Sequence, residues 1–419
     1  MLRATISLVV IVFYYATYLS AQVDSRAAEI EAARDRKAQT LEPDTPTPTE
    51  QTLVDIRDKK VIERITAGIA GFRVKLGGLA TGSGFAVGPE YLRRDLWNRR
   101  ALFRGAAQAS LLGYQKYDLQ FSVPPVSSGA YFLELLAFHR DYPQTGYYGP
   151  GPHSLKTNRS NFRLEDTQWN GTFGVRPVPH LNLAATAGYM LVNVGPGTSD
   201  EYVSSEQIFT PGQTVGINDQ ADFFRNGFYV QYDYRDNPGG PRSGGNYFVE
   251  YNNYSDRTLG LHDFQRLDIE LQQYVPFFNK RRVIALRGRS TLTFAHDNQR
   301  VPFYLQPTLG GSDDLRGFRP FRFYDDNLSV VNGEYRWETF SGLDMALFAD
   351  AGKVFPRRSQ WNFKDIEGSV GFGLRFNVRN NVFLRADVGF SHEGFQVWIK
   401  FNNIFSEGPV NAPHTQLGF

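Results

Sequence analysis

The feature that most constrains this chain is an alternation of apolar and polar residues that recurs through the sequence after residue 70. Residues 266–272 read Arg-Leu-Asp-Ile-Glu-Leu-Gln, and residues 382–390 read Val-Phe-Leu-Arg-Ala-Asp-Val-Gly-Phe. Because successive side chains of a strand point to opposite faces, this period of two predicts strands with one apolar and one charged face. Segments of about ten such residues, separated by turn residues, are typical of barrels in bacterial outer membranes. A soluble β-sandwich shows the same alternation, so the pattern alone leaves that alternative open.

The number and spacing of these segments favour the barrel. The turn residues delimit sixteen candidate strands, at 70–79, 82–90, 100–110, 113–123, 129–142, 160–176, 180–193, 222–236, 245–256, 261–276, 281–297, 327–339, 342–355, 364–378, 381–391 and 394–405. The number is even, and the long connections all fall on one side if the chain enters from the periplasm, as in bacterial barrels. These connections are 143–159, 194–221, 298–326 and 356–363. We therefore expect an all-β chain in which residues 69–405 form a 16-stranded antiparallel transmembrane β-barrel of a Gram-negative outer membrane.

Composition agrees with this fold and excludes several classes of function. The chain has 40 Gly, 34 Phe and 22 Tyr but only three Met, as expected for many strands, tight turns and aromatic rings at the membrane surface. A formal net charge of +2 does not indicate a nucleic-acid partner. The absence of cysteine excludes disulfides and thiolate metal sites, and the seven histidines show no catalytic or metal-ligand spacing. We expect neither an enzyme nor a protein that needs a metal or cofactor.

The two ends of the chain differ from the part between them. Residues 1–22 are predicted to be a signal peptide, with Arg3 before an apolar run from Ile6 to Tyr18. Residues 23–68 are predicted to be a flexible and partly helical periplasmic segment, which contains a charged helix at 27–38, a proline-rich linker at 42–50 and a second short helix at 53–65. Residues 406–419 follow the last strand as a tail. Both termini are expected in the periplasm.

Two short motifs lie in the long connection 298–326 and on the strand at 342–355. They are Leu315-Arg316-Gly317-Phe318 and, about thirty residues later, Phe348-Ala-Asp350-Ala-Gly352. In this order and at these places they resemble the loop and strand motifs of the BamA/TamA superfamily, the outer-membrane barrels also known as bacterial surface antigens. The resemblance covers about residues 69–405 and implies that the loop folds into the barrel lumen. It also implies a protein that inserts barrels or moves polypeptides through the outer membrane.

The alternation places the partners of this loop on the lumen side of two strands. Period two points three residues of the second motif into the lumen, namely Phe348, Asp350 and Gly352. Glu334 faces the same way from the preceding strand. We expect Arg316 to offer its planar guanidinium to Asp350 and Glu334, Gly317 to permit a sharp turn, and Gly352 to leave room for the loop backbone. The alternative is that Arg316 only fills and stiffens the lumen.

The first and last strands must meet to close the barrel, and this seam is expected to be weak. Gly77 and Gly78 reduce pairing and packing on the first strand. The last strand is expected to contain Phe401 and to end at Phe405, which resembles the aromatic end of a barrel-targeting signal. A seam that opens sideways exposes a strand edge, and such an edge can template the strand of a client polypeptide.

The resemblance implies outer-membrane lipid and client polypeptides or barrel precursors as partners. Relatives carry periplasmic substrate-binding modules before the barrel, and residues 23–68 are too few for one, which implies a separate periplasmic partner. The alternative function is a passive outer-membrane pore or structural barrel, in which the inserted loop only sets the bore of the channel.

Overall fold

The computed structural model describes residues 28, 30–35, 69–77, 79–378, 380–401 and 405. The chain divides into two compact units, residues 1–62 and 63–419. In the first unit, the described residues are helical and fall within the predicted charged helix. The predicted signal peptide, proline-rich linker, second short helix and C-terminal tail lie outside the described residues. Within the described parts of the chain, no helix is both long and apolar enough to cross a membrane.

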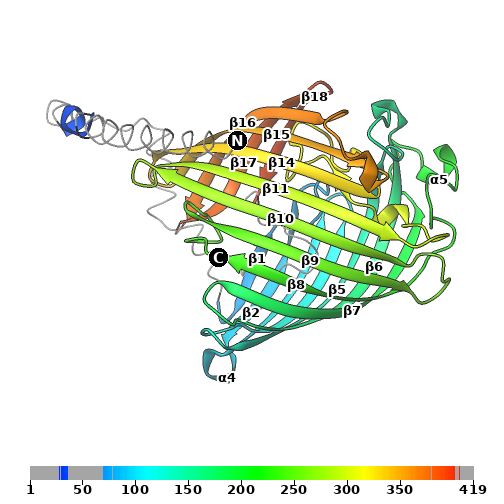
Figure 1. The fold of residues 1–419 in the computed structure, drawn as a ribbon, viewed down its shortest axis with the longest axis horizontal. Helices are drawn as coiled ribbons and strands as arrows, with labels where there is room; N and C mark the ends of the chain where they lie inside the picture. Colours follow the sequence, from blue (N-terminus) through cyan, green and yellow to red (C-terminus); the bar gives the residue numbers. More distant parts are fainter. Residues whose placement is uncertain are drawn as a thin grey trace, which may run out of the picture. The chain divides into compact units, whose positions relative to one another are not determined.

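The described residues of the second unit form one antiparallel sheet of sixteen strands, in which each strand pairs with its neighbours along the chain (Figure 1). The strands are β1 (Phe72–Leu76), β2 (Ala86–Asp95), β3 (Ala101–Ser110), β4 (Gln115–Val123), β5 (Tyr131–Tyr147), β6 (Ser160–Val175), β7 (Leu181–Pro196), β8 (Phe223–Asp233), β9 (Gly244–Asp256), β10 (Phe264–Phe277), β11 (Arg282–Ala295), β14 (Asn327–Phe340), β15 (Leu343–Phe355), β16 (Glu367–Val378), β17 (Asn381–Ser391) and β18 (Gly394–Lys400). Every segment predicted from the alternation overlaps one of them. The predicted fold class and strand number are therefore confirmed.

Short elements lie in the connections. A one-turn helix α4 (Leu96–Arg99) joins β2 to β3, and α5 (Ser205–Ile208) lies between β7 and β8. Three short 3-10 helices occupy Lys156–Asn158, Phe303–Leu305 and Arg358–Gln360. The strands β12 (Thr308–Leu309) and β13 (Phe323–Tyr324) form a separate pair inside the connection between β11 and β14. This small pair forms the base of the loop that carries the first motif.

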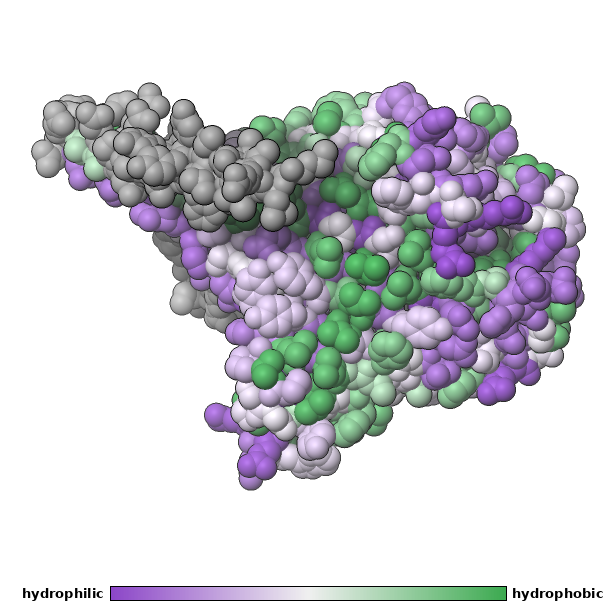
Figure 2. Space-filling view, in the orientation of Figure 1, coloured by the Kyte–Doolittle hydropathy of each residue, from purple (hydrophilic) through white to green (hydrophobic). Residues whose placement is uncertain are grey.

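Alternate residues of each strand face the lumen or the outer surface, as the period of two predicts. On β10, Asp268 and Glu270 are buried on the lumen side, whereas Leu271 is 48% exposed on the outer side. On β7, Asn182 is buried and Leu183 is exposed in the same way. Figure 2 shows apolar side chains gathered over the middle of the wall, with hydrophilic side chains toward the end that carries α5. An apolar exterior around a polar interior is the arrangement that a lipid bilayer requires.

The connections differ in length at the two ends of the sheet. The connections 148–159, 197–222, 296–326 and 356–366 lie at one end, here called the loop end, and the other end is called the turn end. The prediction that the first of these begins at residue 143 is wrong, because β5 continues to Tyr147. At the loop end, Tyr147 packs on Phe303 and Tyr324, with ring centroids 5.1 and 4.9 Å away. These rings join β5 to the connection 296–326 and help to hold it over the lumen.

The last strand is shorter than predicted. β18 ends at Lys400 rather than at Phe405, and β1 covers Phe72–Leu76 rather than 70–79. Pairing runs continuously from β1 to β18, and no ladder between described residues joins these two strands directly. The two ends of the sheet come close at Gly77, where a Cβ atom would lie 3.6 Å from the Cβ atom of Phe401. Gly78, also predicted at the seam, lies outside the described residues.

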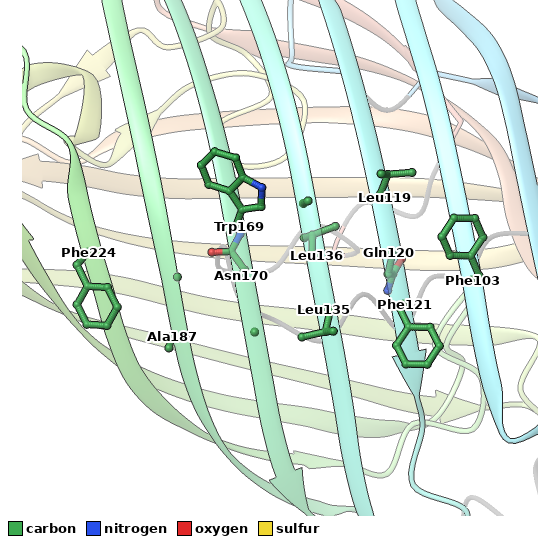
Figure 3. A pocket seen from close by; sticks show the side chains of 13 residues that line it. Phe103, Leu119, Gln120, Phe121, Leu135, Leu136, Trp169, Asn170, Ala187 and Phe224 are labelled. Atoms are coloured by element: carbon green, nitrogen blue, oxygen red, sulfur yellow. The ribbon is translucent and has the colours of Figure 1, made fainter. Parts of the chain in front are cut away.

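An apolar hollow of about 530 Å³ lies on the outer face of the strands β3 to β8. Figure 3 shows large side chains around it, among them Phe103, Phe121, Leu135 and Trp169, whereas Ala187 contributes only a methyl group. The hollow forms because small residues alternate with large ones on a lipid-facing wall. Its apolar lining suits hydrocarbon and separates it from the charged lumen.

Because the outer face of the wall contacts lipid, the cost of placing a charge on it should depend on the depth of that position in the membrane. Leu271→Arg, near the middle of β10, should reduce the free energy of unfolding in lipid vesicles by about 2–4 kcal/mol, because the guanidinium enters hydrocarbon. The matched variant Phe278→Arg changes an exposed ring in the turn after β10 and should cost about 0–1 kcal/mol, because that turn lies near the headgroups. Urea titrations followed by tryptophan fluorescence measure both. Equal costs would mean that the wall does not face lipid as described.

Candidate functional site

The candidate site is a loop that enters the lumen from the connection 296–326. Its base is the β12–β13 pair, in which Leu309 lies opposite Phe323. The side chains of Leu315 and Phe318 are fully buried in an apolar cluster with these two residues and with Leu328, Val330 and Val354 of the wall. A turn in which the Phe318 amide donates to the Leu315 carbonyl at 3.0 Å brings Arg316 between them. Apolar contacts on both sides therefore fix where the guanidinium of Arg316 lies.

Arg316 forms the predicted contact with Asp350. Its Nε and Nη2 atoms donate to the two carboxylate oxygens of Asp350 at 3.0 and 2.7 Å, and its backbone amide donates at 3.1 Å. Both side chains are fully shielded from solvent. Asp350 accepts further hydrogen bonds from Asn332 at 2.8 Å and Ser369 at 3.1 Å. The guanidinium therefore binds the Asp350 carboxylate in a bidentate manner, a geometry that lysine cannot reproduce.

Glu334 is the second anion of the site and receives three arginines. Arg316 Nη1 and Arg336 Nε each donate to it at 2.7 Å, and Arg375 Nη2 donates at 2.9 Å. The Phe348 ring covers the Arg316 guanidinium, with its centroid 3.4 Å from Cζ. Of the four residues predicted to surround Arg316, Glu334, Phe348 and Asp350 thus contact its guanidinium directly.

One of the two predicted glycine roles, that of Gly352, differs from what the structure shows. A Cβ atom on Gly352 would lie 3.1 Å from Val330 of the neighbouring strand, so this residue allows close wall packing rather than loop entry. Gly317 lies in the turn closed by the Phe318 amide and the Leu315 carbonyl, where a sharp turn was predicted, and its backbone there is not left-handed. A Cβ atom there would lie 2.6 Å from the Phe390 carbonyl oxygen. The room for the loop comes from Gly389, where a Cβ atom would lie 2.4 Å from the Arg316 carbonyl oxygen.

Several residues of the network were not singled out as site residues from the sequence. Arg375 and Arg385 both bind Asp387, at 2.6 and 3.0 Å, and Trp398 Nε1 donates to the Arg316 carbonyl at 2.8 Å. The alternation placed the charged residues among them on the lumen face, but it does not show which atoms of the loop they contact. Opposite charges at neighbouring lumen-facing positions of β16 and β17 are the signal that could have found them.

The loop also contacts both ends of the sheet. The Thr81 hydroxyl, between β1 and β2, lies 3.2 Å from the Ser312 hydroxyl and 3.3 Å from an Asp313 oxygen. Arg385 on β17 forms an ion pair with Asp313 and donates to the Ser312 carbonyl at 2.8 Å. We call Thr81, Ser312, Asp313 and Arg385 the seam cluster. Burial alone would raise the pKa of Asp313, but the positive charges of Arg385 and Lys400 and the Ser312 hydroxyl lower it, so this carboxylate stays charged.

Phe405 was predicted to end the last strand, but it does not lie on that strand. It is buried against β10 and β11, in a cluster with Tyr274, Val283 and Ala285. Phe401 lies beyond the end of β18, near Gly77 and 6.0 Å from the Phe85 ring. Of the predicted seam residues, Gly77 and Phe401 are therefore brought together and Phe405 is not. Among the residues that the structure describes, no cluster of histidines and carboxylates could hold a metal ion.

The buried pairing predicts a large and non-additive effect of substitution. Arg316→Ala leaves the Asp350 carboxylate buried without its main partner and should lower the free energy of unfolding by about 3–5 kcal/mol. Arg316→Lys should recover little of this, and the variant carrying both Arg316→Ala and Asp350→Ala should lose less than the sum of the single changes. Urea unfolding in lipid vesicles measures these differences.

The control is Arg93→Ala, which breaks a solvent-exposed ion pair with Asp95 at 2.6 Å. This change should alter stability little, because water and salt screen exposed charges. Strict additivity of the Arg316 and Asp350 substitutions would contradict the pairing.

Comparisons with known proteins agree with the geometry. A family model described as the Omp85 superfamily domain matches residues 103–393. Among solved structures, BamA from Haemophilus ducreyi lacking POTRA domains 1-3 is similar with a TM-score of 0.59 at 15% identity, over 78% of this chain and 70% of that chain. CdiB from Escherichia coli is similar with a TM-score of 0.52 at 11% identity, over 78% of this chain and 61% of that chain.

Comparison with curated protein sequences finds no match. At identities of 15% and 11% the two solved structures show a shared barrel fold. The family match, in contrast, spans well over half of the sequence and includes both motifs of the lumen loop and its docking strand. The chain belongs to the Omp85 superfamily and is an outer-membrane barrel of the BamA/TamA type.

Proposed function

We propose that this barrel inserts or moves polypeptides at the bacterial outer membrane through a lateral seam between β1 and β18, with its turn end toward the periplasm. The observation that carries the proposal is the pairing of β18. Among described residues β18 pairs only with β17, from Ser391 opposite Gly394 to Arg385 opposite Lys400. Its other backbone edge is the position at which an added strand can pair.

The side chains of β18 support the same use of this edge. Phe395, Val397 and Ile399 are exposed on the outer side, whereas Trp398 is buried and points to the lumen loop. A client strand that pairs here continues a wall whose outer face is already apolar. Its backbone groups become hydrogen-bonded before they meet hydrocarbon, which avoids the cost of burying them unpaired.

The seam cluster supports a seam that opens reversibly. Each ordinary neighbour pair in this sheet is joined by a ladder, such as the pairing from Asn327 opposite Phe355 to Phe340 opposite Leu343. A net stabilisation of about 1 kcal/mol for each hydrogen bond makes such a ladder hard to separate. The described contacts between the loop and the two sheet ends include bonds donated by the side chains of Thr81, Arg385 and Trp398. Side-chain bonds of this kind can break and re-form without loss of a backbone ladder.

A disulfide across the seam tests the proposal. In Gly77→Cys/Phe401→Cys, the Cβ separation of 3.6 Å falls within the disulfide range of roughly 3.5–4.5 Å, and the sequence contains no other cysteine. In proteoliposomes the reduced variant should accelerate insertion of a labelled outer-membrane barrel precursor, and the oxidised variant should not. A reductant should restore the activity, because only the opening of the seam has been blocked.

The controls are the single variants Gly77→Cys and Phe401→Cys, each of which has one cysteine and cannot form a bridge within the chain. Oxidation of either single variant should leave insertion unchanged. Full insertion activity of the seam variant, once its disulfide is shown to have formed quantitatively, would contradict the lateral seam. Ion conductance without any acceleration of insertion by the reduced protein would favour the alternative function, a passive pore.

A further inference from the structure

The apolar hollow on the outer face of β3 to β8 has small side chains in its floor. Gly171 on β6 pairs with Leu135 on one side and with Ala187 on the other, so two of these three neighbouring positions carry little or no side chain. The volume of 530 Å³ falls within the roughly 300–1,000 Å³ of sites that hold small molecules. Because its lining is apolar and faces the bilayer, the hollow suits a hydrocarbon chain (Figure 3).

One edge of the hollow continues into residues 91–100, which connect β2 to β3 at the turn end and are here called the α4 hairpin. The Phe121 ring, which lines the hollow, lies 5.4 Å from the ring of Trp97 in α4. The Phe103 ring, which also lines it, lies 6.5 Å from the Tyr91 ring, whose hydroxyl accepts a hydrogen bond from Arg93 at 3.4 Å. Phe121 is two residues from the end of β4, about 7 Å along the strand. The hollow therefore reaches nearly to the turn end, where aromatic rings meet lipid headgroups.

The α4 hairpin carries an excess of positive charge. It contains four arginines and one carboxylate, that of Asp95, which pairs with Arg93 at 2.6 Å. Arg99 and Arg100 are exposed at its tip. The neighbouring connection, residues 124–130, contains no charged residue. Guanidinium groups bind phosphate in a bidentate manner, so this charge beside an apolar hollow matches a molecule that joins a phosphate to a hydrocarbon chain.

The connection between β10 and β11 provides a comparison within the same molecule. Both connections contain three consecutive residues with positive φ, Trp97 to Arg99 in one and Phe278 to Lys280 in the other, and an arginine follows each. In the second connection Lys280 pairs with Asp236 at 3.0 Å, and no residue of that connection lines the hollow. The two connections thus share a turn geometry, and they differ in the apolar hollow beside the first one.

We propose that the hollow and the α4 hairpin together bind one anionic phospholipid, with an acyl chain in the hollow and the phosphate at Arg99 and Arg100. The hollow alone would accept the chain of any lipid. The arginines add a preference for a headgroup with net negative charge, because a zwitterionic headgroup is attracted less strongly to a basic segment. The site lies on the outer wall and uses no residue of the lumen loop, so this inference does not depend on whether the barrel handles client polypeptides.

Native mass spectrometry tests the headgroup preference. The full-length protein is reconstituted in vesicles of equal parts phosphatidylglycerol and phosphatidylcholine and is released into detergent before the measurement. The wild-type protein should retain phosphatidylglycerol in preference to phosphatidylcholine. Arg99→Gln/Arg100→Gln should lower the fraction of chains with bound phosphatidylglycerol severalfold, because the phosphate loses its cations. The matched control Arg281→Gln/Arg282→Gln removes two exposed arginines after the equivalent turn and should leave this fraction unchanged.

A second pair of variants tests the hollow. Gly171→Leu fills its floor, and a Cβ atom there has no neighbour closer than 3.6 Å, so the sheet can accept the change. This variant should also lower the fraction with bound phosphatidylglycerol severalfold. The control Gly288→Leu adds the same side chain opposite Leu271 on the lipid-facing side of β11, where a Cβ atom has no neighbour within 4 Å, and should change nothing. Heat-modifiable migration on gels establishes that each variant has folded.

Three results would overturn the proposal. The first is equal retention of the two lipids by the wild-type protein, which would mean that the wall binds hydrocarbon without regard to headgroup. The second is an equal loss of phosphatidylglycerol from a variant and its matched control. The third is a protein dimer in place of a lipid adduct, abolished by Gly171→Leu, which would assign the hollow to a second copy of this chain.

Discussion

The burial of Arg316 between Asp350 and Glu334 is the interaction on which the rest of the lumen depends. A guanidinium in a site without water must have its charge and its donors matched, because an unpaired buried charge costs several kcal/mol. Arg316 meets this demand with bonds to two carboxylates and a ring over its face. The loop therefore has one strongly favoured position, and a small displacement would leave charges on both the loop and the wall without partners.

The position of the loop in turn sets the contacts at the seam. Ser312 and Asp313 lie on the same short segment as Arg316, and they bond to Thr81 on one side and to Arg385 on the other. Arg385 is tied through Asp387 to Arg375, which also binds Glu334. A continuous ionic path thus joins the centre of the network to the last strands. The alternative role, in which Arg316 only fills and stiffens the lumen, is compatible with this network, because a rigid loop holds the two ends of the sheet together.

Local pattern was enough to predict the strands and the faces of their residues, but not the contacts between distant parts. Alternation put Asp350 and Glu334 in the lumen, and the motif put Arg316 between them. It could not show that Gly389, rather than Gly352, makes room for the loop, because that depends on how near two backbones come. It also extended the last strand to Phe405, since an aromatic residue fits a strand end as well as it fits the apolar cluster on β10 and β11. Thr81 could not be predicted as a contact residue, because a single hydroxyl residue between two glycine-rich segments is not part of any periodic pattern.

The most direct test of this account asks whether the buried pair positions the loop at the seam. A Cβ atom on Gly311 would lie 3.5 Å from that of Thr81, so the variant Thr81→Cys/Gly311→Cys places a disulfide between the loop and the first hairpin. The rate of its oxidation should be measured with Arg316 present and in the Arg316→Ala background, in protein shown to be folded by heat-modifiable migration. The account predicts rapid and complete bridging with Arg316 and slow, partial bridging without it. Bridging at the same rate in both backgrounds would contradict it.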